Sequence, residues 1–478
     1  MTSILKSKTF SAIVWSSLDR FSVQGIQFIL SFVIARKLSP SDYGLIAMLG
    51  IFMALAQTFI DSGFSNALIQ KQNRTLIDFS TVFYFNIIVS VFLYAFLCLL
   101  APAISAFYNQ PLLESIIKWV GLNFIIHAFS TVQRAKLIIE LDFRRQAVIS
   151  IISVVVSGAV AVYLAYNGYG VWTLVVQALL NNLIGVVLLW ISAHWHPQWV
   201  FSVVSFKELF GFGSKLLGGA ILHTIYVNMY TLVIGKVFSS TELGYYNRGY
   251  TITQYPSSNI TTILTRVTYP IECQMQNDDK ELQDKFYLFI RLTAFFVFPM
   301  MIGLAVVSES LVRIILTDKW IGCVVYLQIM CFAYMWDPIM RMIWDLLNVK
   351  HRGDYSLKSE ILKKVVAFGL LFITIPLGIK AMCLGLICYS LSDIVIVTQY
   401  TKRILPQVTF GKVVKSLFPV LFISLLMGGI VYIIQFIFIN VWLQLWFGIV
   451  VGVCVYLSCA YFFRFKELNY ILVQFKEK

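Results

Sequence analysis

Residues 243–270 read LGYYNRGYTITQYPSSNITTILTRVTYP. At about 1.5 Å per residue this stretch is long enough to cross a membrane as a helix, yet it is rich in tyrosine, threonine, serine and arginine. Its polar residues recur at three- and four-residue steps and so form one stripe on a helix: Arg248, Thr251, Tyr255, Ser258, Thr262 and Arg266. In a bilayer such a stripe must face other protein or a wet cavity. We therefore expect it to form one wall of a central, cationic, water-filled pathway.

The composition around this stretch is that of a membrane protein. Hydrophobic residues make up 59% of the chain, charged residues 13%, and the mean hydropathy is +0.81, whereas an ordinary soluble domain has about 25% charged residues. We predict an all-α, polytopic integral membrane protein with about fourteen transmembrane helices and short connections. The first apolar segment, about 11–35, is too long for the core of a signal peptide, so no cleavable signal is expected.

The net charge of +14 follows the predicted topology. Basic residues cluster in alternate connections, as in 134–145, 350–364 and 402–415, and the intervening connections carry few. This positive-inside bias places the clusters and both termini in the cytoplasm. It explains the charge without a nucleic-acid partner.

Two segments two hundred residues apart resemble each other. Residues 35–44 read ARKLSPSDYG and residues 235–244 read GKVFSSTELG, so Gly44 aligns with Gly244. Six predicted helices separate the copies, so both have the same orientation, as in a parallel repeat; a chance likeness between two turns is the alternative. A repeat predicts two six-helix lobes, 1–200 and 201–403, with a cleft between them and two accessory helices in 404–478.

The first predicted helix has a polar face. It consists of Ser16, Arg20, Gln24, Gln27 and Ser31, with Asp19 beside it. An arginine near the middle of a membrane helix costs about 2.5–3.5 kcal/mol, so a partner, a cavity or a function must offset it. Arg20 is either an anion contact in the cleft or a packing residue neutralised by Asp19.

Other ionisable residues lie within predicted helices. Asp61 shares a face with Gln57, and Lys215 lies near the cytoplasmic end of a glycine-rich helix. Asp337, Arg341 and Asp345 stand at four-residue steps, as a self-neutralised ladder or as gating residues. Asp393 is either hydrogen-bonded within the bundle or a ligand of a coupling ion.

Several chemistries have no signature in the sequence. There is no P-loop, no cluster with metal-ligand spacing, and no large external loop with paired carboxylates to activate a sugar hydroxyl. We therefore expect no enzyme activity, no cofactor and no metal. Energy is expected to come from a Na⁺ or H⁺ gradient, from the membrane potential or from later consumption of the product.

Several short motifs, in order, resemble those of a known family. They are 35–44 with the following helix, DSGFSNALIQ at 61–70, LGYYNR at 243–248, TRVTYP at 265–270, Lys319-Trp320, and RGDY at 352–355. The chain resembles the polysaccharide transporters of the multidrug/oligosaccharidyl-lipid/polysaccharide exporter superfamily, particularly the colanic-acid-exporter-like flippases. Two departures concern glycine: Thr317-Asp318 precede Lys319-Trp320 where the family usually has Gly, and His351-Arg352 replace the usual Gly-Arg.

The resemblance implies two lobes in a V around a central cavity. It implies alternating access that moves oligosaccharide on undecaprenyl pyrophosphate across the bacterial inner membrane, for O-antigen, capsule or exopolysaccharide. Membrane lipid, a polysaccharide polymerase and a chain-length regulator are the implied partners. Which glycan is carried is left open.

The anionic head group suggests roles for the polar residues, since arginine binds phosphate in bidentate fashion. Arg20 and Arg266 are the first candidates for the diphosphate, and further candidates for the substrate are Lys215, Arg291, Arg248, Gln24 and Asn259. Tyr246, Tyr250 and Tyr255 are candidates to stack on sugars. Asp19, Asp61, Asp337, Arg341 and Asp393 are candidates for coupling or gating, and family members of known role use an Asp/Arg pair in helix 1, which Asp19 and Arg20 match.

Two other functions compete with a flippase. A drug or cation antiporter of the same superfamily would need unpaired acids in its cavity, whereas the two candidate walls carry Arg20, Arg248 and Arg266 against Asp19 and Asp61. That balance favours an anionic cargo. A membrane polysaccharide polymerase lacks support because no large external loop is present.

Overall fold

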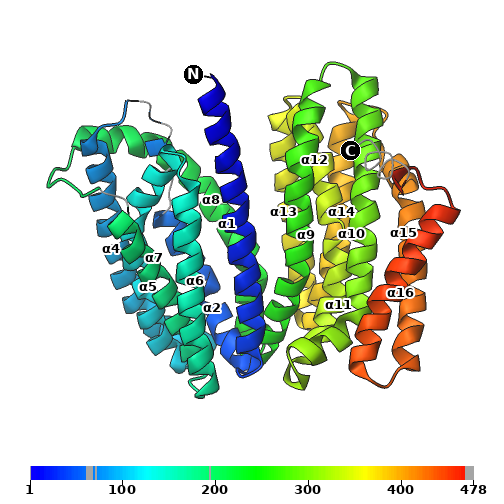
Figure 1. Cartoon of the computed structure of the whole chain (residues 1–478), viewed down its shortest axis with the longest axis horizontal. Helices are drawn as coiled ribbons and strands as arrows, with labels where there is room; N and C mark the ends of the chain where they lie inside the picture. Colours follow the sequence, from blue (N-terminus) through cyan, green and yellow to red (C-terminus); the bar gives the residue numbers. More distant parts are fainter. Residues whose placement is uncertain (1, 61–67, 70, 72, 193–194, 469–478) are drawn as a thin grey trace. The chain divides into compact units, whose positions relative to one another are not determined.

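The computed structural model describes residues 2–60, 68–69, 71, 73–192 and 195–468. Within these ranges the regular structure is helical, as predicted. The helices are α1 (Thr2–Ala35), α2 (Pro40–Ile60), α4 (Leu76–Tyr108), α5 (Leu112–Ile139), α6 (Phe143–Tyr166), α7 (Trp172–Ser192), α8 (Val203–Val237), α9 (Ser240–Gln274), α10 (Asp279–Ile315), α11 (Cys323–Tyr334), α12 (Asp337–Val349), α13 (Gly353–Thr374), α14 (Ile379–Lys402), α15 (Phe410–Ile437) and α16 (Val441–Phe462) (Figure 1). Short 3₁₀ turns occupy Asp318–Trp320 and Ile375–Leu377.

The number of crossings agrees with the prediction of about fourteen. In the described part, twelve helical segments are long and apolar enough to span a membrane, with α11 and α12 counted as one. Helices α9 and α13 have 35 and 22 residues but are too polar for that criterion. Apolar side chains also cover the outside of the helices, as lipid requires: Leu99 is 80% exposed and Phe436 is 72% exposed.

By its internal contacts the chain forms two compact units, Met1–Gly244 and Tyr245–Lys478. The predicted lobe boundary at residue 200 rests on the repeat rather than on contacts, and it stays a prediction.

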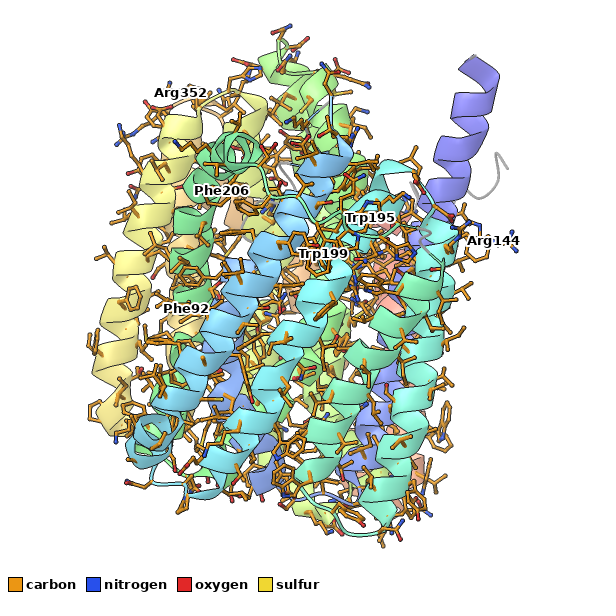
Figure 2. All side chains as sticks on the ribbon, turned by 90° about the vertical axis from the view of Figure 1, so that its left-hand side faces the viewer. Phe92, Arg144, Trp195, Trp199, Phe206 and Arg352 are labelled. Atoms are coloured by element: carbon orange, nitrogen blue, oxygen red, sulfur yellow. The ribbon has the colours of Figure 1, made fainter. Side chains whose placement is uncertain are left out.

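The first unit is a bundle in which α1 packs on α6, α4 on α5, α7 on α5 and α6, and α2 on α8. An aromatic cluster closes one end of it, where Trp195 is buried against Phe83 and Trp190. Trp199, which Figure 2 labels next to Trp195, stacks on Tyr84 with ring centroids 5.9 Å apart. Tryptophans at a helix-bundle end are typical of a membrane–water interface.

The two copies of the repeated segment have the same helix caps and touch each other. The Ser39 hydroxyl accepts from the backbone N–H of Asp42 at 3.2 Å, and the Ser239 hydroxyl accepts from that of Glu242 at 3.2 Å. A Cβ on Gly44 would lie 1.7 Å from the carbonyl oxygen of Ser240. A Cβ on Gly244 would lie 1.9 Å from that of Pro40, so the contact is reciprocal and only glycine fits at either place.

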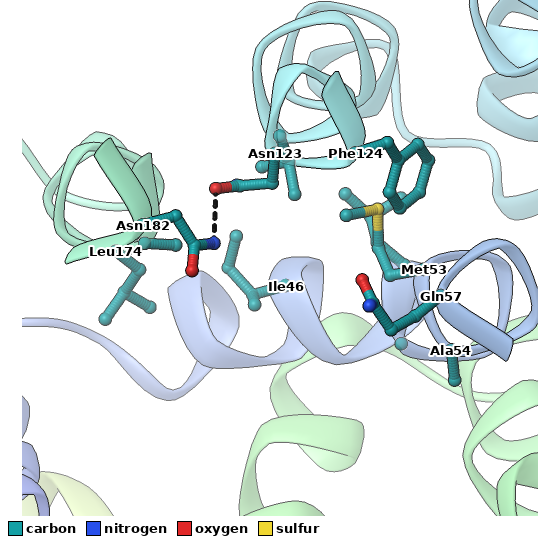
Figure 3. Close-up of a pocket in the computed structure, with 12 residues that line it drawn as sticks. Ile46, Met53, Ala54, Gln57, Asn123, Phe124, Leu174 and Asn182 are labelled. Carbon is teal, nitrogen blue, oxygen red and sulfur yellow. Dashed lines mark hydrogen bonds between the residues drawn. The ribbon is translucent and has the colours of Figure 1, made fainter. Parts of the chain in front are cut away.

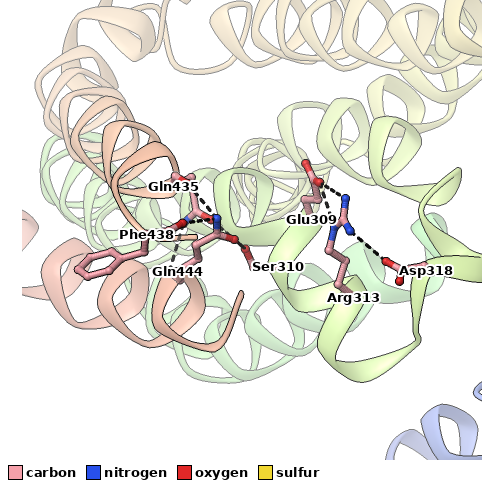
Figure 4. A network of polar contacts seen from close by, with 7 residues as sticks. All are labelled: Glu309, Ser310, Arg313, Asp318, Gln435, Phe438 and Gln444. Carbon is pink, nitrogen blue, oxygen red and sulfur yellow. Dashed lines mark hydrogen bonds and ion pairs between the residues drawn. The ribbon is translucent and has the colours of Figure 1, made fainter. Parts of the chain in front are cut away.

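In the second unit, α10 packs on α11, α15 and α16, and α14 packs on α11, α12 and α13. A polar network fixes the two C-terminal helices to α10 (Figure 4). The Ser310 hydroxyl of α10 lies 2.8 Å from Gln435 Oε1 and 2.9 Å from Gln444 Oε1, and the Gln444 amide donates to the Gln435 carbonyl at 2.9 Å. Because these groups satisfy one another, they are stable in an apolar setting.

Two of the family-like motifs meet in this unit. Trp320 is fully buried, the Arg248 guanidinium lies 5.1 Å from its ring centroid, and the Tyr245 hydroxyl donates to the Lys319 carbonyl at 3.1 Å. These contacts give the 243–248 motif and the Lys319-Trp320 pair a shared role in packing.

Both departures from the family pattern lie at backbone positions that favour glycine. Thr317 has a φ of 84° and His351 a φ of 55°, and both values lie in the left-handed region that glycine adopts without steric cost. After His351, Arg352 donates to both carboxylate oxygens of Asp354, at 2.8 and 2.9 Å. These hydrogen bonds lower the pKa of Asp354 to about 2.

Replacing Thr317 by glycine is expected to stabilise the protein. Thr317 combines its φ of 84° with a ψ of 168°, a conformation that costs a non-glycine residue about 1–3 kcal/mol. After the extra chain entropy of glycine, about 0.5–1 kcal/mol, we expect a net gain of about 1 kcal/mol, seen as a higher melting temperature of the purified protein. Asn109→Gly is the control, because Asn109, at φ 54°, tolerates the left-handed region. A Thr317→Gly protein that melts no higher than wild type would contradict the strain.

Candidate functional sites

The first unit contains a polar cavity of ≈ 240 Å³ between α1, α5, α6 and α7. Its hydrogen-bonding side chains are Gln27, His127, Arg134, Gln146, Ser150, Ser153, Asn181 and Asn182. Five residues of α6 and four of α7 line it, and Gly185 on α7 leaves room there: a Cβ at that position would lie 3.5 Å from Ser153 Oγ. The site therefore depends on the packing of α6 against α7.

Acceptor oxygens without donors surround this cavity. Gln146 Oε1 and Asn181 Oδ1 are buried and have no hydrogen-bond partner among the described residues. The same holds for Oδ1 of Asp19, whose carboxylate is hydrogen-bonded to Ser150 and interacts electrostatically with Arg134. Buried acceptors normally have donors, so these oxygens indicate that water or a ligand supplies them.

A second, larger cavity of ≈ 420 Å³ adjoins the first and is mostly apolar (Figure 3). Asn182 lines both cavities and donates to Asn123 Oδ1 at 2.7 Å. His127 of the polar cavity lies 3.1 Å from the Gln57 amide of the apolar one. Amide and imidazole pairs thus fix the boundary between the two spaces, and His127 is a hydrogen-bonded packing residue there.

The second unit contains a buried charge cluster on α12, α13 and α14. Lys363 is 7% exposed and Asp393 is 5% exposed. The Lys363 ammonium lies 3.3 Å from Asp393 Oδ1 and 2.6 Å from Glu360 Oε1, and Asp337 interacts electrostatically with both Asp393 and Lys363. Asp393 is therefore an ion-paired residue rather than an isolated acid.

The two arginines predicted to bind the diphosphate have exposed side chains. Arg20 is exposed on α1, with Gln24 half-buried one turn later, and Arg266 is exposed near the end of α9. Asp61 lies outside the described residues, and so does the side chain of Lys215. Arg20 and Arg266 are therefore not buried by the packing of their own units.

Other predicted contacts on α9 are packed inside the second unit. Arg248 is 5% exposed against Trp320, and Tyr246 is 4% exposed. Tyr250 is half-buried with its ring 5.7 Å from that of Tyr334. This placement argues against substrate contacts for Arg248 and Tyr246, because neither reaches the surface of its unit.

Three other predicted residues have protein partners. Arg291 forms an ion pair with the buried Glu467. Arg341 forms an ion pair with Asp345 at 3.2 Å, which is the self-neutralised alternative given for these residues in the sequence. The Asn259 amide donates to the carbonyl of residue 255 at 2.8 Å, while Tyr255 itself is half-buried.

Sequence reasoning missed two residues of these sites. Arg134 and Lys363 were counted among the basic residues of cytoplasmic connections, but Arg134 lines the polar cavity from α5 and Lys363 is buried in α13. A signal was present, because the segments expected to cross the membrane at about 115–138 and 359–378 also contain these two residues. A basic residue inside a membrane helix is a functional candidate before it is a topological one.

The sequence profile of the polysaccharide biosynthesis protein family matches residues 33–325, more than half of the chain. The chain belongs to this family. It is 26% identical to the lipopolysaccharide biosynthesis protein WzxC of Escherichia coli K12, over 75% of this chain and 73% of the relative. It is 27% identical to the teichuronic acid biosynthesis protein TuaB of Bacillus subtilis, over 74% of each. The match confirms the family that the motifs indicated.

Solved structures show the same fold. The lipid II flippase MurJ, in an inward closed conformation, superposes with a TM-score of 0.73 at 14% identity, over 95% of this chain and 99% of that one. An inward-facing multidrug transporter of the MATE family gives 0.63 at 15% identity, over 83% and 98%. These neighbours show that the chain has their fold, and its twelve described helical segments able to span a membrane make it a multi-pass membrane protein.

Proposed function

We propose that the protein is a flippase that moves an undecaprenyl-pyrophosphate-linked oligosaccharide from the cytoplasmic to the outer leaflet of the bacterial inner membrane. The product would enter O-antigen, capsule or exopolysaccharide. The observation that carries the proposal is the exposure of Arg20 and Arg266 on long helices of a membrane transporter, because membrane helices rarely carry arginine without a function. The name of the Escherichia coli relative and the fold shared with a lipid flippase support it.

The proposed mechanism assigns the diphosphate to these two arginines. A guanidinium group binds phosphate oxygens through two parallel N–H donors, and it stays charged at every physiological pH. The glycan would enter a hydrated pathway lined by the exposed part of α9, while the polyprenyl chain remains in lipid. Alternating access would then present the head group to the other leaflet.

Coupling is proposed to use the buried acids. Asp393 and Asp337 share Lys363, the one lysine that is buried among the described side chains. Binding of one cation, H⁺ or Na⁺, would change the charge balance of this cluster, and the membrane potential would act on its charged groups. In the first unit, Asp19 is the proposed coupling acid, and it interacts electrostatically with Arg134. The basic residues in alternate connections favour a cytoplasmic location of both termini. A polysaccharide polymerase and a chain-length regulator are proposed as partners.

Loss of either diphosphate arginine is expected to block transport. In a host lacking the gene, undecaprenyl-linked repeat units should accumulate on the cytoplasmic leaflet. Wild type should clear them, whereas Arg20→Ala and Arg266→Ala, at equal membrane expression, should slow clearance at least tenfold, since each removes a charge-assisted contact worth about 1.5–3 kcal/mol. Mass spectrometry of extracted lipids measures the effect.

Two comparisons make this experiment decisive. Lys402→Ala, at the exposed end of α14, is the matched loss of a basic residue and should clear the lipid normally. If no lipid-linked sugar accumulates without the gene, while resistance to cationic compounds changes, the antiporter alternative replaces the flippase.

A further inference from the structure

We infer that the polar cavity of the first unit is a subsite for the sugar that is attached directly to the diphosphate. The inference rests on the proposed flippase function and names a binding site for the neutral part of its head group. The cavity is the one between α1, α5, α6 and α7 described above.

The chemistry of the lining selects a ligand that donates hydrogen bonds. Gln146 Oε1 and Asn181 Oδ1 in the lining, and Asp19 Oδ1 beside the lining residues Ser150 and Arg134, are buried acceptors without partners in the described part of the chain. Each unmade hydrogen bond of this kind costs about 1–3 kcal/mol. A pyranose carries several hydroxyl groups that can both donate and accept, so one sugar can satisfy several of these oxygens at once.

The charge of the lining disfavours a metal cation as the occupant. The Arg134 guanidinium reaches the cavity and interacts with Asp19, so this carboxylate already has a cationic neighbour. A second cation in the same space would be repelled by Arg134. A neutral polyhydroxyl group meets no such repulsion, and arginine, amide and imidazole groups bind it by hydrogen bonds alone.

The position of the cavity fits a sugar next to Arg20. Gln27, at its α1 edge, is exposed and lies seven residues after Arg20. Seven residues are about two turns, or about 10 Å along one face of the helix, so a diphosphate held by Arg20 places the first sugar beside Gln27. The volume of ≈ 240 Å³ is roughly eight times the ~30 Å³ of one water, which suits one monosaccharide rather than a longer glycan.

Binding to two lipids tests the inference. Purified protein in nanodiscs is titrated with bare undecaprenyl pyrophosphate and with the lipid-linked repeat unit extracted from the host that lacks the gene. For wild type we expect tighter binding of the repeat-unit lipid. Asn181→Leu and Gln146→Leu should weaken binding of the repeat-unit lipid about tenfold and leave the Kd of the bare lipid unchanged, which also shows that each variant is folded.

Matched controls separate this subsite from the proposed function itself. Asn167→Leu, an exposed change at the end of α6, should alter neither Kd, and Arg20→Ala should weaken both. If the cavity variants bind both lipids as wild type does, or if wild type does not distinguish the two lipids, the cavity holds water only and the inference is wrong while the flippase stands. If wild type binds neither lipid, the proposed function fails and the inference fails with it.

Discussion

Gly44→Ala is expected to remove most of the folded protein from the membrane, and Gly244→Ala is expected to do the same. The added methyl group would lie 1.7 Å from the Ser240 carbonyl oxygen in the first case and 1.9 Å from the Pro40 carbonyl oxygen in the second. The colliding atoms belong to backbone, so no rotamer change relieves the clash and one helix must move. Overpacking of side chains alone costs about 1–3 kcal/mol. The clash with backbone atoms in either variant should cost more than that.

The measurement is the monodisperse peak of a fluorescent fusion in detergent, followed by its melting temperature. Gly25→Ala and Gly369→Ala are matched controls on helices, since a Cβ at either position meets nothing within 4 Å. These two changes should be neutral or stabilise by up to about 1 kcal/mol, because alanine is the better helix former. If the Gly44→Ala protein has the same melting temperature as these controls, the two repeat copies do not touch in the folded protein.

Lys363→Met is expected to be the most destabilising single change in the second unit. It leaves Asp393, which is 5% exposed, without its buried cation. Removing one partner of a buried ion pair costs about 3–5 kcal/mol, because the remaining charge is uncompensated. We expect a large loss of thermal stability and of lipid-linked sugar clearance.

Two further variants test the physical reason. Lys363→Met combined with Asp393→Asn removes both charges and should recover much of the lost stability. Lys364→Met, on the same helix but 31% exposed in its pair with Glu360, should cost less than about 1 kcal/mol. If the double variant is no more stable than Lys363→Met, or if Lys364→Met is equally damaging, the Lys363–Asp393 pair does not hold the cluster together.

The polar stripe on α9 shows where sequence reasoning goes too far. The stripe was predicted to face a wet pathway, yet the hydroxyls of Thr251 and Thr262 donate to the carbonyls four residues earlier, both at 2.8 Å. Such internal hydrogen bonds satisfy threonine without water. The stripe is also divided: Arg248 is buried, whereas Ser258 and Arg266 are exposed. The hydrated wall is thus proposed only for the later part of the helix.

The sequence by itself determined the membrane class, the all-α fold, the family and about how many crossings the chain makes. These depend on composition, on helical periodicity and on short motifs, which are local properties. It also pointed to Arg20, Arg266, Asp337 and Asp393, because an ionisable residue is conspicuous in an apolar helix.

Only the tertiary structure decided which of these residues have partners. It paired Asp393 with Lys363, enclosed Arg248 against Trp320, and joined α5, α6 and α7 around one cavity. It also brought Gly44 against Ser240, 196 residues away in the chain. Burial and pairing depend on which helix faces meet, and no local pattern specifies that.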